Sequence, residues 1–361
     1  MKLSICETIV HIIYRIDNKE QIDEKRMKKF TYRVVNAFVN NNNNNNNKKK
    51  EEEEEEEGHT QIQLLGNPAA VIVLDAEKSN ESESTSKEEK QMIARKLGFS
   101  ETAFIWEDLN RQQQGSKCFH IEWFSPTNEI SLCGHATLAS AACIFNDIYC
   151  SSESEPIVFI YEEGRNELRL ERCDATGAIT MSFPASPLVS VDAKEASRRF
   201  GLVREAFGDS CTSESSFPVY ENSIGDTFIY ITETLVSSVD EIYFDSKKKI
   251  DYDKLKKVGG RGVVVTALSI PEKKETVQCD FKSRFFGPNI GIDEDPVTGS
   301  AHCGLAPFYS SKLSSSFSGG GKFLRGYQKS SRGGLVLCRA VGDRVELRGF
   351  CAFDNTDTVE I

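Results

Sequence analysis

A short motif occurs twice in this chain, and the repeat limits the folds that the chain can adopt. Residues 129–136 read Glu-Ile-Ser-Leu-Cys-Gly-His-Ala, and residues 294–301 read Glu-Asp-Pro-Val-Thr-Gly-Ser-Ala. Both copies continue into small or apolar residues at helix-compatible spacing, over 138–145 and 303–309. We therefore expect two equivalent lobes, each of which places the start of one helix in the same way.

The remainder of the chain is rich in predicted strands. A helix is expected after Ser86, because Ser86 and Glu89 have the spacing of a capping box and Gly98 follows the last apolar position of the helix. Together these patterns predict an α+β fold. Strand-like runs of β-branched and aromatic residues occur at 30–39, 69–74, 102–106, 119–124, 157–161, 167–170, 179–183, 227–232, 262–267, 334–339 and 344–347.

The length and local composition predict how these elements are divided. A chain of 361 residues is long enough for about two compact units. We expect an N-terminal extension over 1–29, a first lobe over 30–186 and a second lobe over 187–347, with residues 348–361 completing the first lobe. The Asn, Lys and Glu runs within 40–60 cannot bury apolar area, so a disordered insert is expected there between two strands.

Composition and charge argue against several classes of function. The net charge of −11 comes partly from residues 48–57, and no basic stripe interleaved with aromatics suggests nucleic-acid binding. No run approaches the roughly 20 apolar residues that span a membrane, and the start lacks the pattern of a signal peptide. The eleven cysteines form no Cys-x-x-Cys pair, which predicts reduced thiols and a cytoplasmic location. The five histidines lack zinc-site spacing, so no metal is expected.

The two glycines of the repeated motif suggest a binding site for an anion. A helix whose first turn contains glycine lets a ligand approach its free backbone N–H groups and the positive end of its dipole. If Gly134 and Gly299 face each other, they can hold a small carboxylate from both sides, with His135 and Ser300 directed toward it. The alternative is that the glycines only allow close packing of a helix on a sheet.

Glu101 is a candidate acid or base. It lies between Ser100 and Thr102, where the expected helix gives way to a strand, so its carboxylate can face a cleft while its neighbours stay packed. Burial there is expected to raise its proton affinity, and general acid–base catalysis contributes about 10²- to 10⁴-fold in rate. The alternative is an ordinary solvated turn residue.

Five segments, taken together, resemble a known family. One is the block over 280–303, which includes Arg-Phe-Phe at 284–286, and its run at 294–303, Glu-Asp-Pro-Val-Thr-Gly-Ser-Ala-His-Cys, is long enough to be specific alone. The others are Gly-Asn-Pro-Ala-Ala-Val at 66–71, Ser-Glu-Thr-Ala-Phe at 100–104, Cys-Gly-His-Ala-Thr at 133–137 and residues 328–334. They resemble, in order, the motifs of the phenazine-biosynthesis (PhzF-like) isomerases, which share their fold with diaminopimelate epimerase.

The resemblance implies a specific architecture and activity. It implies a diaminopimelate epimerase-like fold of two pseudo-symmetric lobes, each a sheet or barrel wrapped around a central helix, and a homodimer. Glu101 matches the family's catalytic glutamate, which moves a proton to or from a ring carbon, and no cofactor is expected. We expect the catalytic residues to be Glu101, His135 and Asp295. A small anionic carboxylate is expected to be bound by Gly134, Thr298, Gly299 and Ser300.

Two other functions remain open at this stage. Related racemases place one cysteine at each helix start, but here Thr298 stands opposite Cys133, and a hydroxyl is far too weak an acid to replace a thiol. Cys303 is a nearby thiol, more than one helical turn beyond Thr298. The other possibility is a non-catalytic binding or regulatory protein. Arg332, in a Ser-Ser-Arg-Gly-Gly turn, either contacts a substrate carboxylate or holds the turn.

Overall fold

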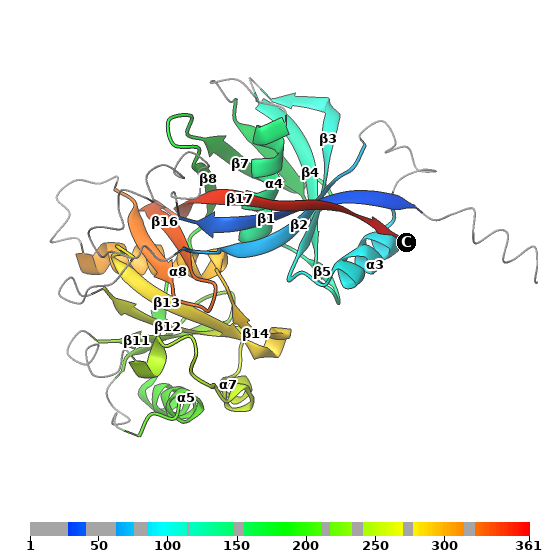
Figure 1. The fold of residues 1–361 in the computed structure, drawn as a ribbon. Coiled ribbons are helices and arrows are strands. Elements are labelled where there is room, and N and C mark those ends of the chain that lie inside the picture. Colours follow the sequence, from blue (N-terminus) through cyan, green and yellow to red (C-terminus); the bar gives the residue numbers. More distant parts are fainter. Residues whose placement is uncertain are drawn as a thin grey trace, which may run out of the picture.

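The computed structural model describes nine segments of the chain, and these form two lobes joined along one side (Figure 1). Most of the predicted N-terminal extension (1–29) and of the predicted insert (40–60) lie outside the described residues. The predicted lobe boundaries at 186/187 and 347/348 stay predictions. The described segments are 28–40, 63–75, 85–113, 116–147, 155–210, 217–232, 241–269, 277–313 and 322–361.

The first lobe is built mainly from the N-terminal half of the chain. Its elements are β1 (Lys29–Val39), β2 (Asn67–Val73), α3 (Lys87–Leu97), β3 (Thr102–Gln113), β4 (Ser116–Phe124), β5 (Glu129–Ile130), α4 (Gly134–Asp147), β6 (Ile157–Tyr161), β7 (Asn166–Arg172) and β8 (Ile179–Pro184).

The second lobe contains the remaining elements, the last of which also contributes to the first lobe. They are β9 (Val189–Ser190), α5 (Ala193–Ala206), β10 (Val219–Glu221), β11 (Asp226–Ile231), α7 (Tyr252–Val258), β12 (Gly262–Leu268), β13 (Phe281–Gly287), the 3₁₀ helix η5 (Pro288–Ile290), β14 (Ile292–Asp295), α8 (Gly299–Leu313), β15 (Leu324–Gln328), β16 (Gly334–Val341) and β17 (Arg344–Glu360).

The strand pairing repeats from one lobe to the other. In the first lobe β2 runs parallel to β3 and β4 runs parallel to β6, and in the second β11 runs parallel to β12 and β13 runs parallel to β15. Parallel neighbours need a crossover connection. The crossover connections of the first lobe contain the helices α3 and α4, and the crossover connections of the second lobe contain α7 and α8. The repeated motif thus marks a repeated unit, and the predicted α+β fold with two pseudo-symmetric lobes is confirmed.

Strand β17 joins the two lobes. Its first part, 344–349, pairs with β8 on one side and with β16 on the other. Its second part, 350–360, pairs with β1 and closes the first lobe into a barrel in the order β1-β2-β3-β4-β6-β7-β8-β17. Figure 1 shows this strand running along the top of the second lobe and across the first.

The central helix α4 is almost completely enclosed, and the central helix α8 is largely buried from Gly299 to Tyr309. Every residue of α4 from His135 to Phe145 is buried, and most of them are small. Small side chains let the surrounding strands approach the helix closely, and a helix that is apolar all round is stable only when it is buried. One continuous hydrophobic cluster includes residues of both helices, such as Leu138 and Leu305, so the lobes share a core.

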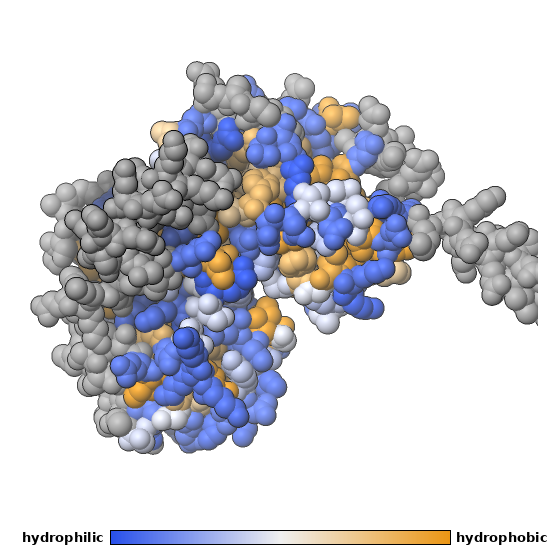
Figure 2. All heavy atoms as spheres, in the orientation of Figure 1, coloured by the Kyte–Doolittle hydropathy of each residue, from blue (hydrophilic) through white to orange (hydrophobic). Residues whose placement is uncertain are grey.

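Among the described residues, three further α-helices cover the outside of the lobes. The predicted capping box of α3 is confirmed, with Ser86 as N-cap, and Gly98 ends the helix in the left-handed conformation. Helices α5 and α7 were missed by the sequence analysis, although Asp192 and Asp251 cap them. These two helices pack over a second hydrophobic cluster on the second lobe (Figure 1). On the face shown in Figure 2, polar residues predominate over that lobe.

Gly334, the first residue of β16, lies where the two lobes meet, and its replacement tests that packing. A Cβ on Gly334 would lie 2.2 Å from Cγ2 of Val297 and 3.0 Å from the carbonyl oxygen of Phe38. We expect Gly334→Ala to lower the free energy of unfolding by about 1–3 kcal/mol, as overpacking does. Urea denaturation measures the change.

Gly201, inside α5, provides the matched control, because nothing lies within 4 Å of a Cβ added there. Gly201→Ala should raise the free energy of unfolding by about 0.5–1 kcal/mol through helix propensity. Equal effects of the two alanines would contradict the described packing between the lobes.

Candidate active site

The starts of the two central helices lie against each other. Gly134 is the first residue of α4 and Gly299 is the first residue of α8. A Cβ built on either glycine would lie 3.6 Å from the Cα atom of the other. The first backbone N–H groups of each helix have no partner within the helix itself. The positive ends of two helix dipoles therefore meet at one point, which favours a negative charge there.

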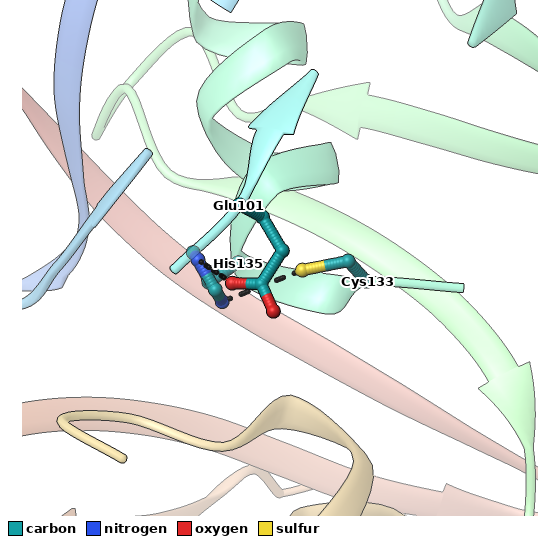
Figure 3. A group of neighbouring side chains, drawn as sticks. All are labelled: Glu101, Cys133 and His135. Atoms are coloured by element: carbon teal, nitrogen blue, oxygen red, sulfur yellow. Dashed lines mark hydrogen bonds and ion pairs between the residues drawn. The ribbon is translucent and has the colours of Figure 1, made fainter. Parts of the chain in front are cut away.

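Glu101 lies beside this junction and faces His135. The chain leaves α3 at Gly98, and Glu101 is the last residue before β3. Its Oε2 atom lies 3.1 Å from Nε2 of His135, the second residue of α4. Glu101 is only 8% exposed, and His135 is 5% exposed. Figure 3 shows the carboxylate, the imidazole and the Cys133 thiol directed toward one another.

This pair is best described as a carboxylate with an imidazolium. Burial raises the pKa of Glu101, but the charge and hydrogen bond of His135 outweigh it, and the net pKa is lowered. Burial lowers the pKa of His135, but Cys133 and the Glu101 carboxylate raise it well above its usual value. The expectation that burial raises the proton affinity of Glu101 is wrong, because the imidazolium stabilises the charged form.

Cys133 completes this group and raises the question of a metal. Its Sγ atom lies 3.5 Å from Nδ1 of His135, and burial together with the charge of Glu101 raises the pKa of the thiol. The possible ligand atoms of Glu101, Cys133 and His135 lie within 4.8 Å of one another. A carboxylate, a thiolate and an imidazole suit a zinc ion, which would compete with the ion pair for the same atoms. The prediction that the chain binds no metal stays a prediction.

Asp295 joins the site from the second lobe through Asn67. The Asn67 side chain donates to Oδ1 of Asp295 at 2.8 Å and to the carbonyl of Val297 at 3.0 Å, and its amide nitrogen lies 3.2 Å from Nδ1 of His135. Asn67 is fully buried, and its Oδ1 atom has no hydrogen-bond partner among the described residues. This amide links the first-lobe histidine to the second-lobe carboxylate, and the sequence analysis did not single it out.

Asp295 differs from Glu101 in the direction of its pKa shift. Burial and the charge of Glu101 together raise the pKa of Asp295 to about 6, although His135 and hydrogen bonds from Thr298 and Asn67 oppose the shift. The two carboxyl groups around one imidazole therefore have pKa values displaced in opposite directions. Such a separation is typical of acid and base roles in one site.

Thr298 holds Asp295 rather than facing an open space. Its hydroxyl donates to Oδ2 of Asp295 at 2.5 Å, and its backbone N–H donates to Oε1 of Gln328 at 2.8 Å. The Gln328 amide in turn donates to the carbonyl of Asp295 at 2.7 Å. The sequence analysis included Gln328 only as the first residue of the matching segment 328–334, and it missed the role of this residue as a support of the second helix start.

Ser300, the second residue of α8, contacts an arginine that the sequence analysis did not identify. Its hydroxyl oxygen accepts a hydrogen bond from Nη2 of Arg261 at 2.9 Å. Arg261 also makes a bidentate pair with the buried carboxylate of Asp226, at 2.8 and 2.6 Å. Of the predicted set, Glu101, His135, Gly134 and Gly299 form one group of contacts, and Asp295 and Thr298 adjoin it through Asn67.

Other side chains near the site, those of Cys303, His302 and Arg332, contact nearby backbone carbonyls. Cys303 is buried with its thiol 3.6 Å from the carbonyl of Gly299, and burial raises its pKa to about 12, which argues against two-thiol racemisation. His302 is fully buried against the carbonyl of Thr298. Arg332 donates to the carbonyls of residues 65 and 66 and to the Asn36 side chain, so it holds the loop before β2.

The described helices include none that is both long and apolar enough to cross a membrane. What the site offers is a buried ionised carboxylate, a cation beside it, a second carboxyl group that titrates near pH 6, and two converging helix starts. These groups can bind an anion and move a proton. Neither anion binding nor proton transfer requires a nucleophile that forms a covalent bond with the substrate.

Comparison with known proteins identifies the family. A family model described as "Phenazine biosynthesis-like protein" matches residues 57–353. Phenazine biosynthesis-like domain-containing protein 1 of Mus musculus is 34% identical over 291 residues, which cover 79% of this chain and 90% of that protein. An uncharacterized isomerase of Pseudomonas aeruginosa is 34% identical over 285 residues, which cover 79% of this chain and 88% of that protein.

Solved structures agree with this result. The crystal structure of a PhzF-family phenazine biosynthesis protein from Enterococcus faecalis superposes with a TM-score of 0.62 at 27% identity, over 92% of this chain and 100% of that one. The diaminopimelate epimerase-like fold that the resemblance implied is therefore confirmed. With the matched family model, the relatives and the shared fold, the chain belongs to the phenazine biosynthesis-like (PhzF) family.

Proposed function

We propose that this protein is an isomerase that moves a proton between two carbons of a small anionic carboxylate, without a cofactor, and that Glu101 is its general acid and base. The observation that carries this proposal is the Glu101–His135 ion pair, buried beside two helix starts whose glycines touch. Membership of the PhzF family supports an isomerase or epimerase activity, and one relative is itself named an isomerase.

The proton transfer uses Glu101 as a base first and as an acid second. Its lowered pKa keeps it ionised near neutral pH. It takes the proton from a tetrahedral carbon of the substrate, and the electron pair of the broken C–H bond enters the substrate's conjugated system. The same carboxyl group then returns the proton to another carbon on the same face, so Glu101 ends ionised and no atoms are gained or lost.

The substrate anion is held where the helices meet. The N–H groups at Gly134 and Gly299 supply backbone donors, and the hydroxyl of Ser300 supplies a side-chain donor. Negative charge that develops on the substrate is stabilised by the same donors and by the imidazolium of His135, because these dipoles are already in place. Thr298 serves indirectly in this scheme, since both its hydroxyl and its N–H are used to hold Asp295 and Gln328.

Asp295 acts in the proposed reaction through its charge. When ionised, it accepts hydrogen bonds from Asn67 and Thr298 and balances the imidazolium of His135. Protonation removes that balance and requires the carboxyl group to donate where both neighbours also donate. The ionised form is therefore the active one.

The proposal also covers the surroundings in which the enzyme works. The substrate is the expected small carboxylate, and a homodimer is expected from the family resemblance. A cytoplasmic location is supported by the cysteine pattern of the sequence, which contains no Cys-x-x-Cys pair. A non-catalytic role is less well supported, because a carboxylate buried beside an imidazole costs stability that a purely structural site does not require.

Replacing Glu101 tests the base directly. Glu101→Gln keeps the shape of the side chain but removes its charge, so turnover should fall by about 10²- to 10⁴-fold. The measurement is the rate at which a dihydro-hydroxyanthranilate is isomerised, followed by NMR in heavy water. Glu129→Gln is the control, because Glu129 forms only a surface ion pair with Lys87. An unchanged rate in Glu101→Gln, or no turnover by the wild-type protein across a panel of small cyclic carboxylates, would count against the proposal.

The pH profile tests Asp295. Because its pKa is raised to about 6, it is ionised above that pH and neutral below it. We expect kcat/KM of the wild-type protein to fall as the pH drops through about 6, and we expect this limb to be absent from the slower Asp295→Asn variant. A limb that persists unchanged in the variant would show that another group titrates there.

A further inference from the structure

The pseudo-symmetry of the lobes places Arg261 where the first lobe has Glu101. Glu101 immediately precedes β3, whose first residue pairs with Ala70 of β2. Arg261 immediately precedes β12, whose first residue pairs with Asp226 of β11. In both cases the strand follows an outer helix that ends at a glycine, Gly98 for α3 and Gly259 for α7. The two residues therefore occupy equivalent positions.

Their contacts are equivalent as well. Glu101 reaches the second residue of α4, His135, at 3.1 Å, and Arg261 reaches the second residue of α8, Ser300, at 2.9 Å. The glycines that precede these two residues touch each other. The order of contacts thus runs from Glu101 and His135, through the glycine junction, to Ser300 and Arg261. A carboxylate stands at the first-lobe end and a guanidinium at the second-lobe end.

The guanidinium is firmly held. Its Nε and Nη2 atoms donate to both carboxylate oxygens of Asp226, and its Cζ atom lies over the ring of Phe285, 5.1 Å from the ring centroid. Asp226 is fully buried, and its backbone N–H donates to the Asn222 side chain at 2.8 Å. A bidentate arginine pair fixes direction as well as distance. The hydrogen bond from Arg261 to Ser300 is thereby directed by groups outside the junction.

This bond determines what the Ser300 hydroxyl can do. A serine hydroxyl has one hydrogen to donate, and an oxygen that accepts from a guanidinium keeps that hydrogen available. A charged donor also polarises the O–H group, which strengthens the hydrogen bond that it makes to an anion. His135 and Ser300 therefore differ in role, because the first lies beside a base and the second is prepared as a donor.

We infer that Arg261 is a positioning residue that selects substrates with a carboxylate on the second-lobe side of the glycine junction, acting through the hydroxyl of Ser300. This inference rests on the proposed function and adds a substrate class to it. The preferred acids carry their carboxylate apart from the exchangeable C–H group, so that the anion lies toward Ser300 while the carbon faces Glu101. Arg261 does not touch the reacting carbon.

A double-mutant cycle between Arg261 and Ser300 tests this inference. Arg261→Gln is made together with Asp226→Asn, so that no buried carboxylate is left without its partner, and this pair is compared with Ser300→Ala and with the triple variant. The probe for binding is an aromatic hydroxyanthranilate, which keeps the carboxylate but has no tetrahedral carbon to lose a proton. Calorimetry gives its Kd, and a dihydro-hydroxyanthranilate gives KM and kcat.

We expect the Arg261→Gln and Asp226→Asn pair to bind the probe about 10- to 100-fold more weakly, the effect of losing a charge-assisted hydrogen bond, with KM rising more than kcat falls. In the Ser300→Ala background the same pair should add less than about threefold, because the route through the hydroxyl is already gone. Arg261→Lys, which keeps a charged donor, should restore part of the affinity.

Other outcomes would overturn the inference. Full additivity with Ser300→Ala would show that Arg261 acts by another route, and unchanged affinity with a lowered melting temperature would show that it only supports Asp226. The proposed function is judged separately by Glu101→Gln, which should bind the probe but lose turnover. If the wild-type protein turns over its substrate but its affinity for the probe does not change when Arg261 is replaced, only the inference fails. If the wild-type protein neither binds the probe nor turns over the substrate, both the inference and the proposed function fail.

Discussion

The contact between Gly134 and Gly299 is the constraint on which the rest of this structure depends. A Cβ built on either glycine would lie 3.6 Å from the Cα atom of the other, which is van der Waals contact, so the two glycines let the helix starts approach each other closely. Each helix is directed at that point by the strands around it, and β17 holds both sets of strands in one framework, because it pairs with β8, β16 and β1. The site is therefore a property of the junction and not of either lobe alone.

Burial at this junction determines the electrostatics. Two carboxyl groups and one imidazole lie out of water, and an isolated charge there would be costly. The cost is reduced because Glu101 pairs with His135, while Asp295 receives hydrogen bonds from Asn67 and Thr298. The result is one acid with a lowered pKa and another whose pKa is raised to about 6. The same framework thus displaces the pKa values of the two carboxyl groups in opposite directions.

The two lobes share a backbone plan but differ in chemistry. Equivalent positions carry Glu101 and Arg261 before a strand, and His135 and Ser300 at the second position of a helix. Cys133 and Thr298 stand before the two glycines. A duplicated scaffold of this kind with identical side chains would treat both ends of a ligand alike. The differences place a carboxylate–imidazole pair at one end of the junction and an arginine–carboxylate pair at the other, so the two ends are chemically distinct.

The sequence by itself determined the features that depend on residues close together along the chain. The repeated Gly motif, the capping box at Ser86 and the alternation of strand-like runs are local patterns, and they predicted the two lobes, helix α3 and most strands. Only the tertiary structure revealed Asn67, Gln328 and Arg261 as site residues, because their partners lie 30 to 230 positions away along the chain. It also decided the charge of Glu101. Proton affinity depends on what surrounds a side chain in space, and the imidazolium that lowers it comes from a different element of the fold.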